Sequence, residues 1–309
     1  MVREDSFVDS LGAGRLHVCR WSPEGTPRGI VQIIHGIAEH VRRYDELAEY
    51  LNSLGYLVVA EDHMGHGESI NGDGIQGYFH GGWFTAVEDS CGLLTRTRQE
   101  FPALPYVLLG HSMGSFMART ILCKHPDSGI SAAVICGTGW QPRAMLPGAI
   151  ALCQGVCKAS GETKPSPFLE NLVFGSYNKR VEHPRTKYDW LSRDGKNVDA
   201  YIAGPLCGFT ATAGLLREML VGIRYIEDPK NLNDMNKDVP VLFIAGGDDP
   251  VGSYGSGVRR AAEEFRKAGV KSVTERIYPL CRHELFNEIN RSEIRKNLSD
   301  WIEDILNKS

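Results

Sequence analysis

The chain has 309 residues, of which 42% are hydrophobic and 23% are charged. That composition is ordinary for a soluble globular protein, and it excludes a disordered, collagen-like or coiled-coil chain. The net charge of −4 offers no basic field for nucleic acid, so we expect no nucleic-acid partner. No run of about 18 apolar residues occurs, so we expect no membrane span.

The first residues and the cysteines indicate the cell compartment. Residues 1–9 include Arg3, Glu4, Asp5 and Asp9, unlike a secretory signal with its apolar run. None of the eight cysteines falls in a C-x-x-C pair. We therefore expect reduced thiols and a cytoplasmic location.

Short apolar runs alternate with helical patterns through the first 140 residues. An alternating run at 16–21 predicts an edge or hairpin strand, and buried-looking runs at 30–34, 57–60, 106–109 and 132–136 predict further strands. The apolar spacing over 42–54 and 85–100 predicts helices. Strands that alternate with helices indicate an α/β fold with a mainly parallel sheet.

The same pattern resumes near residue 241. Strands are expected at 241–245 and 273–278, with a helix over 256–268 that ends at Gly269. A C-terminal helix is predicted by one apolar stripe, made of Ile294, Leu298, Trp301, Ile302 and Ile305.

Between these two parts, residues 140–237 do not continue the alternation of predicted strands and helices. The segment has 13 Lys and Arg against 10 Asp and Glu, a net charge of +3 in a chain whose total is −4. We interpret it as a cap inserted at a strand end, where an open α/β sheet receives its ligand. The expected catalytic unit is therefore 1–139 together with 238–309.

The strongest motif is Gly110-His111-Ser112-Met113-Gly114, which follows one predicted strand and precedes a helical pattern. Strand, G-x-S-x-G and helix form a sharp turn that lifts a nucleophilic serine above the sheet. Side chains at Gly110 and Gly114 would collide with the neighbouring strand and helix. The alternative is a glycine-rich turn with an inert serine.

A serine nucleophile needs a base and an acid. In enzymes with this turn the histidine follows the last strand and the acid follows the one before it. His283 stands a few residues after 273–278, and Asp248 and Asp249 both follow 241–245. The order alone leaves the two carboxylates as alternatives.

An oxyanion hole needs two backbone N–H donors. The residue after the nucleophile, Met113, is expected to supply one. The loop His35-Gly36-Ile37-Ala38-Glu39-His40, which follows an early strand, fits the other. In the same loop we expect Glu39 and Arg43 to form a structural ion pair rather than a catalytic one.

Together these motifs resemble the monoacylglycerol lipase and lysophospholipase group of the α/β-hydrolases. The resemblance rests on three further segments of the sequence, which are His35–His40 with Arg43-Tyr44, Asp62-His63-Met64-Gly65-His66-Gly67-Glu68-Ser69, and Gly246-x-x-Asp249 with His283. It implies a mainly parallel central sheet flanked by helices, with an inserted helical cap. The cap segments 174–178 and 186–192 resemble a bacterial branch of the group.

The resemblance also implies roles for single residues. It gives Ser112, Asp249 and His283 as the catalytic triad, and the Ile37 and Met113 amides as the oxyanion hole. The implied reaction is hydrolysis of a small acyl ester, a monoacylglycerol or a lysophospholipid, through an acyl-enzyme and without a cofactor. His63-x-x-His66 lacks a nearby third ligand, so we expect no metal there.

The substrate side of the site is expected in the cap. The apolar run 145–152 contains Met145, Leu146, Ile150 and Leu152, which we predict as acyl-chain contacts. The run is either plain cap core or an entrance lip that touches a membrane surface transiently. No feature indicates an oligomeric state.

Two alternatives remain beside the ester hydrolase. One is an aminopeptidase or small-ester hydrolase of the same superfamily. The peptidase would need acidic groups in the cap to hold an ammonium, against which the cap's positive charge weighs. The other is a non-catalytic relative, although all three triad positions are filled here.

Overall fold

A computed structural model of the chain describes residues 2–70 and 74–307. Its centre is one eight-stranded sheet with the strand order β1-β2-β4-β3-β5-β6-β7-β8. The strands are β1 (Val2–Asp9), β2 (Arg15–Ser22), β3 (Gly29–Ile34), β4 (Tyr56–Glu61), β5 (Tyr106–His111), β6 (Ala132–Cys136), β7 (Val241–Gly246) and β8 (Val273–Tyr278). β2 pairs antiparallel with β1 and β4, and every later pairing is parallel. The expected α/β fold is confirmed.

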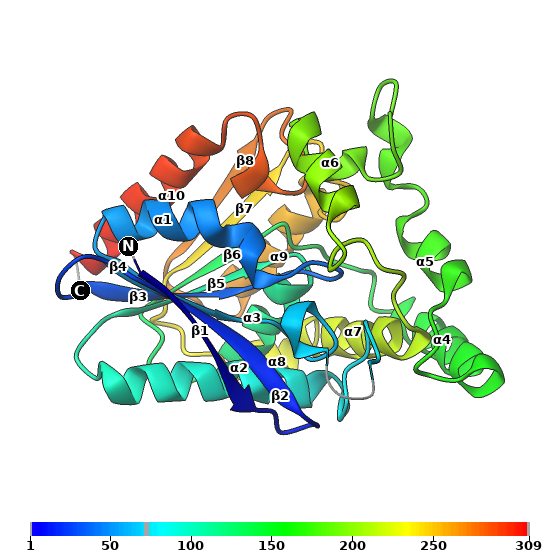
Figure 1. The fold of residues 1–309 in the computed structure, drawn as a ribbon, viewed down its shortest axis with the longest axis horizontal. Helices are drawn as coiled ribbons and strands as arrows, with labels where there is room; N and C mark the ends of the chain where they lie inside the picture. The colour runs from blue at the N-terminus through cyan, green and yellow to red at the C-terminus, as the bar shows by residue number, and fades with distance from the viewer. Residues whose placement is uncertain (1, 71–73, 308–309) are drawn as a thin grey trace.

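Helices cover both faces of this sheet (Figure 1). The α-helices are α1 (Asp45–Ser53), α2 (Gly82–Glu100), α3 (Met113–Lys124), α4 (Leu146–Ser160), α5 (Pro167–Phe174), α6 (Gly195–Ala203), α7 (Ala213–Ile226), α8 (Pro229–Asp234), α9 (Ser256–Lys267) and α10 (Arg291–Leu306). Short 3-10 helices span Val41–Tyr44, Gly67–Ser69, Tyr177–Arg180, Asp189–Leu191 and Leu285–Asn287. No helix among the described residues is long and apolar enough to cross a membrane.

Two hydrophobic clusters sandwich the sheet. Successive strand residues point to opposite faces, so Ile30 and Ile34 join the cluster with α2, α3 and α9, whereas Val31 and Ile33 join the one with α1 and α10. Strands buried on both faces read as continuous apolar runs, which is why the sequence revealed them.

Two elements differ from the sequence expectation. The helix expected over 42–54 begins as the 3-10 turn Val41–Tyr44, where the Val41 N–H donates to Asp62 Oδ1 at 2.8 Å, and becomes α-helical only from Asp45. Strand β1 was not expected, because its largely polar and exposed residues lack a strand pattern. It exists through backbone pairing with β2 over its whole length.

The inserted segment 140–237 contains α4 to α8, between β6 and β7. α4 and α5 lie at the end of the molecule remote from both termini (Figure 1). α7 instead packs into the core, since a Cβ at Gly222 would lie 2.1 Å from the Trp83 ring. The division into a catalytic unit and a cap stays a prediction, and its residues 1, 71–73 and 308–309 lie outside the described part.

All eight cysteines lie in the described residues, and all are free thiols.

Candidate active site

Ser112 occupies the turn between β5 and α3. Its backbone has φ 54° and ψ −122°, a strained conformation for a residue with a side chain. A Cβ at Gly110 would lie 2.3 Å from the Gly114 carbonyl oxygen, and one at Gly114 would lie 2.1 Å from that of Ile34. Both glycines are therefore required by close backbone approach, as the sequence argument predicted.

Asp249 and His283 meet at the end of the sheet from the loops after β7 and β8. His283 Nδ1 lies 3.0 Å from Asp249 Oδ2, and both side chains are buried. The Val251 N–H donates to Asp249 Oδ1 at 2.9 Å and fixes the carboxylate. Asp248 is exposed. Geometry thus selects Asp249 as the histidine's partner, where the order of residues left two choices.

His283 lies between two aromatic rings. Its ring centroid is 4.8 Å from that of His111 and 5.1 Å from that of Trp190. The His283 N–H donates to the Trp190 carbonyl at 3.4 Å, and the Glu284 N–H donates to the Leu191 carbonyl at 2.7 Å. Main-chain bonds therefore tie the histidine loop to the 3-10 turn Asp189–Leu191 of the inserted segment.

The loop after β3 faces Ser112 across the same cavity. Ile37 and Met113 both line it, as expected for the two oxyanion donors. Met113 is the first residue of α3, where backbone N–H groups have no acceptor within the helix. The Gly36 N–H donates to Glu39 Oε1 at 2.6 Å, so a buried carboxylate holds the loop in shape.

A buried charge network lies beside this loop. Arg43 contacts Glu39 Oε2 at 3.0 Å, which confirms the expected ion pair. The same guanidinium contacts Glu284 Oε1 at 2.5 Å and Oε2 at 2.7 Å. Burial alone would raise the pKa of both carboxyls. Hydrogen bonding from His111 and the charge of Arg43 hold the pKa of Glu39 well below its ordinary value, and Arg43 lowers that of Glu284.

His111, next to the nucleophile in sequence, belongs to this network. Its Nδ1 lies 2.9 Å from Tyr44 Oη and 3.1 Å from Glu39 Oε1, and the Tyr44 hydroxyl donates to the same Glu39 oxygen at 2.9 Å. Burial alone would lower the pKa of His111, but the Glu39 carboxylate raises it above its ordinary value. His111 thus supports the loop through Glu39 and packs against His283.

A cavity of about 670 Å³ opens above Ser112 and His283. Its walls come largely from apolar side chains of α3 and the inserted segment, among them Phe116, Met145, Leu146, Ala149, Leu172, Val173, Phe174, Met219, Leu220 and Ile223. Glu170, Asn171 and Lys187 add polar groups to the lining. An apolar cavity with a few polar groups is the usual form of a small-molecule site.

Only two of the four predicted acyl-chain contacts lie at the cavity. Met145 and Leu146 line the cavity, whereas Ile150 and Leu152 are not among its lining residues. Ala149 lines the cavity with Met145 and Leu146, whereas Ile150, also one helical turn from Leu146, does not. Ile150 is buried, and Leu152 is 41% exposed.

Comparison with known proteins identifies the family of the chain. The sequence pattern of a family described as "Serine aminopeptidase, S33" matches residues 25–290. The chain belongs to this family. Its α/β-hydrolase fold is shared with a carboxyl esterase from Bacillus coagulans, solved in complex with glycerol, at a TM-score of 0.91, with 29% identity and 99% of each chain covered.

Curated relatives of this α/β-hydrolase include two lipases. A monoacylglycerol lipase from Mycolicibacterium smegmatis is 29% identical over 302 residues, covering 97% of this chain and 96% of the relative. A human monoglyceride lipase is 39% identical over 239 residues, covering 76% and 70%. The resemblance to the monoacylglycerol lipase group is thereby confirmed.

Sequence reasoning missed two parts of this hydrolase site. Trp190 and Tyr177 line the cavity, with ring centroids 4.8 Å apart. Both lie in the segments 174–178 and 186–192 that carried a resemblance, but nothing there assigned them to the cavity. The role of Glu284 was also missed. Its position directly after His283 could have indicated this role, because a carboxylate buried beside the proposed base needs a cationic partner.

Proposed function

We propose that the protein is a serine carboxylic ester hydrolase. Ser112 Oγ attacks the acyl carbonyl while His283 takes its proton, and the departing alcohol receives that proton as the acyl-enzyme forms. A water activated by His283 then releases the acid. Asp249 holds the imidazole in the tautomer that this requires, and the Ile37 and Met113 amides stabilise the oxyanion.

One observation carries this proposal. The Asp249–His283 pair, at 3.0 Å, and Ser112, in its strained turn, open onto the same apolar cavity. A buried serine with an inert role would not need this turn. The two relatives with lipase names and the carboxyl esterase with the same fold support the reaction class.

We propose monoacylglycerols or lysophospholipids as the substrate class. The cavity's apolar walls suit an acyl chain, and each methylene buried there would contribute about 0.8 kcal/mol. Met145, the N-cap residue of α4, and Leu146, the first residue of that helix, are the proposed chain contacts. The polar side chains of Glu170, Asn171 and Lys187 in the same cavity would suit the glycerol end of the substrate.

An aminopeptidase activity is the second candidate, favoured by the description of the matching family. It needs a free carboxylate to hold an ammonium. Glu39 and Glu284 line the cavity but already pair with Arg43. Glu170 Oε1 lies 3.9 Å from Lys187 Nζ, whereas Glu170 Oε2 has no hydrogen-bond partner among the described residues, so Glu170 is the carboxylate that an ammonium would use. The pairing of the other two carboxylates favours ester hydrolysis over peptide hydrolysis.

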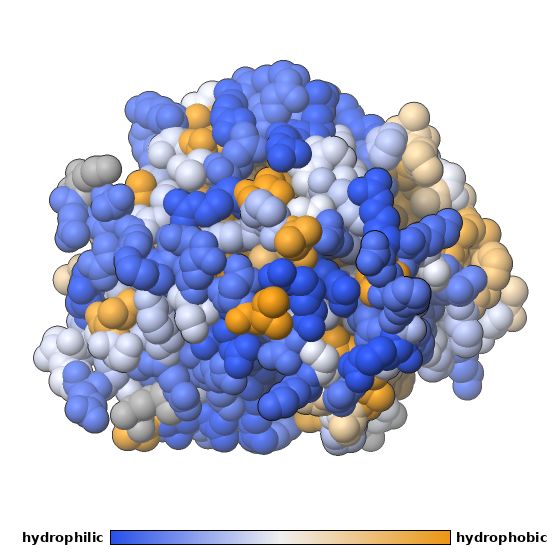
Figure 2. All heavy atoms as spheres, turned by 90° about the horizontal axis from the view of Figure 1, so that it is seen from above, coloured by the Kyte–Doolittle hydropathy of each residue, from blue (hydrophilic) through white to orange (hydrophobic). Residues whose placement is uncertain are grey.

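The exposed face of the inserted segment supports transient contact with a membrane surface. Met145, Leu152, Phe168 and Leu172 are 64%, 41%, 62% and 61% exposed. Figure 2 shows hydrophobic surface gathered toward the end of the molecule where Figure 1 places α4 and α5. A lipid substrate would enter from that side. The cytoplasmic location and the division at residues 140 and 237 remain part of this proposal.

Two measurements test the function. A fluorophosphonate probe should label the wild type and leave Ser112→Ala unlabelled. Esters from acetyl to dodecanoyl, assayed beside N-terminal aminoacyl amides, then separate the candidates. We expect kcat/KM to rise with chain length and the amides to be cut hardly at all. Preference for acetyl esters would favour a small-ester hydrolase, and preference for amides would favour a peptidase. Failure of the probe to label the wild type would favour a non-catalytic protein.

A further inference from the structure

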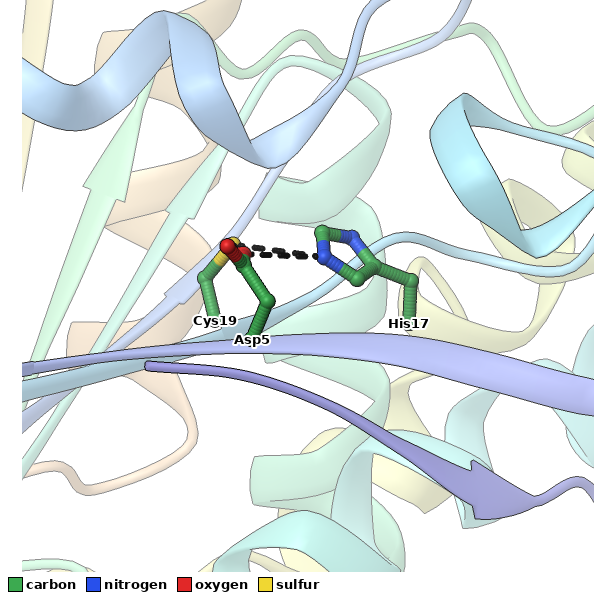
Figure 3. Close-up of side chains that lie close together, drawn as sticks. All are labelled: Asp5, His17 and Cys19. Carbon is green, nitrogen blue, oxygen red and sulfur yellow. Dashed lines mark hydrogen bonds and ion pairs between the residues drawn. The ribbon is translucent and has the colours of Figure 1, made fainter. Parts of the chain in front are cut away.

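Three side chains with metal-binding atoms lie close together between β1 and β2 (Figure 3), and none of them lines the cavity. Asp5 on β1 lies directly opposite Cys19 on β2. His17 stands two residues before Cys19, so the strand's period of two puts both on the same face of the sheet. His17 and Cys19 are fully buried, whereas Asp5 is exposed and opens the group to solvent.

The distances among the three side chains suit a common metal ligand set. Asp5 Oδ1 lies 3.0 Å from both His17 Nε2 and Cys19 Sγ, and the last two atoms lie 3.7 Å apart. Tetrahedral zinc with nitrogen, oxygen and sulfur ligands places its ligand atoms about 3.3–3.6 Å apart. A shift of a few tenths of an ångström in the exposed Asp5 side chain would complete that geometry.

The groups around the three ligands are already oriented as a metal site requires. Asp62 Oδ2 lies 2.8 Å from His17 Nδ1, so the imidazole can donate there and direct Nε2 at the other two ligands. Such a carboxylate behind a histidine is the usual support of a zinc ligand. Arg3 and Arg42 lie 3.6 and 3.8 Å from Asp5 Oδ2, which leaves Oδ1 as the oxygen that faces inward.

A bound metal ion would satisfy the charges between these atoms. With a proton on Nδ1, the lone pair of His17 Nε2 would face a carboxylate oxygen, which also has only lone pairs to offer. A second proton on His17 resolves this conflict, and so does a metal ion. Zinc would replace that proton and the thiol proton of Cys19, so the net charge of the three side chains and their bound cations would stay at zero.

We propose that Asp5, His17 and Cys19 form a zinc site that fastens the edge strand β1 to the sheet. A mixed nitrogen, sulfur and oxygen set favours Zn²⁺ over Mg²⁺ or Ca²⁺. Water completes the coordination, or Glu68, whose Oε1 pairs with Arg42 at 2.8 Å and whose Oε2 lies 3.9 Å from His17 Nε2. None of these residues lines the cavity, so the site is structural and separate from the proposed chemistry.

A second group of three, Glu88, Cys91 and His125, provides an internal control. There Lys124 Nζ and His125 Nε2 contact the same Glu88 oxygen, Oε1, at 2.8 and 3.0 Å, whereas Arg3 and Arg42 contact only the outer oxygen of Asp5. The cysteine of this second group offers a matched substitution that should not affect zinc binding.

The full chain, dialysed against a chelator, is titrated with Co²⁺ as a spectroscopic substitute for zinc. We expect one equivalent to bind with a thiolate-to-cobalt absorption band in the near ultraviolet and strong tetrahedral visible bands. Cys19→Ser should lose the ultraviolet band, and Cys91→Ser should keep it. Asp5→Asn, at an exposed position, should weaken Zn²⁺ competition for the bound Co²⁺ by at least about tenfold.

Zn²⁺ should also raise the melting temperature of the wild type and of Cys91→Ser, but not that of Cys19→Ser, whose fold is checked by circular dichroism. A wild type that takes up no Co²⁺ would overturn the proposal and leave His17 as an imidazolium between two carboxylates. An unchanged ultraviolet band in folded Cys19→Ser would overturn it equally, since another thiol would then be the ligand.

Discussion

Arg43 and Glu284 are 241 residues apart in sequence and form a two-pronged ion pair, with contacts of 2.5 and 2.7 Å. The pair joins the 3-10 turn Val41–Tyr44, which follows the loop with the proposed oxyanion donor, to the residue directly after His283. Because Arg43 also contacts Glu39, one guanidinium neutralises two buried carboxylates. Geometry at both ends of the proposed catalytic apparatus therefore depends on a single cation.

Removing that cation should cost much more stability than removing one anion. Arg43→Met would leave two buried carboxylates without a guanidinium, and we expect a loss of about 3–5 kcal/mol in the free energy of unfolding. Glu284→Gln leaves Arg43 paired with Glu39, and we expect about 1–3 kcal/mol. Urea unfolding at pH 7 measures both. Equal losses in the two variants would contradict the shared role of Arg43.

The two adjacent aspartates after β7 should behave differently in catalysis. Asp249→Asn should lower kcat by roughly 10³–10⁴-fold, because an amide would stabilise the wrong imidazole tautomer of His283. Asp248→Asn serves as the matched control and should change kcat by less than about twofold, since its side chain is exposed. An inactive Asp248→Asn beside an active Asp249→Asn would reverse the assignment.

Chain-length preference should depend on the cavity face of α4. Met145→Asp places a charge in the cavity wall and should flatten the rise of kcat/KM with acyl length, which in the wild type should be roughly fourfold per buried methylene. Acetyl ester hydrolysis should change little. Leu152→Asp is the control, because the Leu152 side chain is exposed like that of Met145 but does not line the cavity. Flattening by Leu152→Asp alone would place the acyl chain elsewhere.

Glu61 should make stability depend on pH. Burial raises the pKa of Glu61 to about 7, and Oε2 has no hydrogen-bond partner in the described structure. The fold therefore favours the protonated acid, so stability should fall as the pH rises from the unfolded pKa of about 4.5 to the folded value. Glu61→Gln should raise the melting temperature by roughly 2–6 °C at pH 8 and leave it unchanged at pH 4.5.

The control for this experiment is Glu49→Gln, at an exposed position of α1. It should shift the melting temperature equally little at both values of pH. A Glu61→Gln variant that is no more stable than the wild type at pH 8 would show that the buried carboxylate carries no charge penalty.

The sequence predicted those elements whose conformation depends mainly on residues near one another in the chain. The helix expected over 256–268 is α9, with Val258, Ala261, Ala262 and Phe265 fully buried, and Gly269 follows it at φ 94°. The serine turn was equally predictable, because two glycines flanking a serine in G-x-S-x-G, between a strand and a helix, are typical of this turn. Here the sequence needed no information from distant residues.

Features that depend on distant partners were not predictable. β1 forms because β2 offers it a ladder of backbone groups, not because its own residues favour a strand. The choice of Asp249 over Asp248 required the position of His283, or a resemblance to supply it. Ile150 and Leu152 looked equivalent to Met145 and Leu146 in an apolar run, and only the orientation of α4 separated them.

The main-chain bonds from His283 and Glu284 to residues 190 and 191 limit how the cavity can admit a substrate. If that turn moved, its two main-chain bonds to the histidine loop would break, and His283, the proposed general base, would lose its position. We therefore expect this turn to be a rigid part of the cavity wall. We expect any widening for a bulky lipid to come from α4, because Phe174 at the end of α5 stacks on the Trp190 ring at 6.4 Å and ties that helix to the same turn.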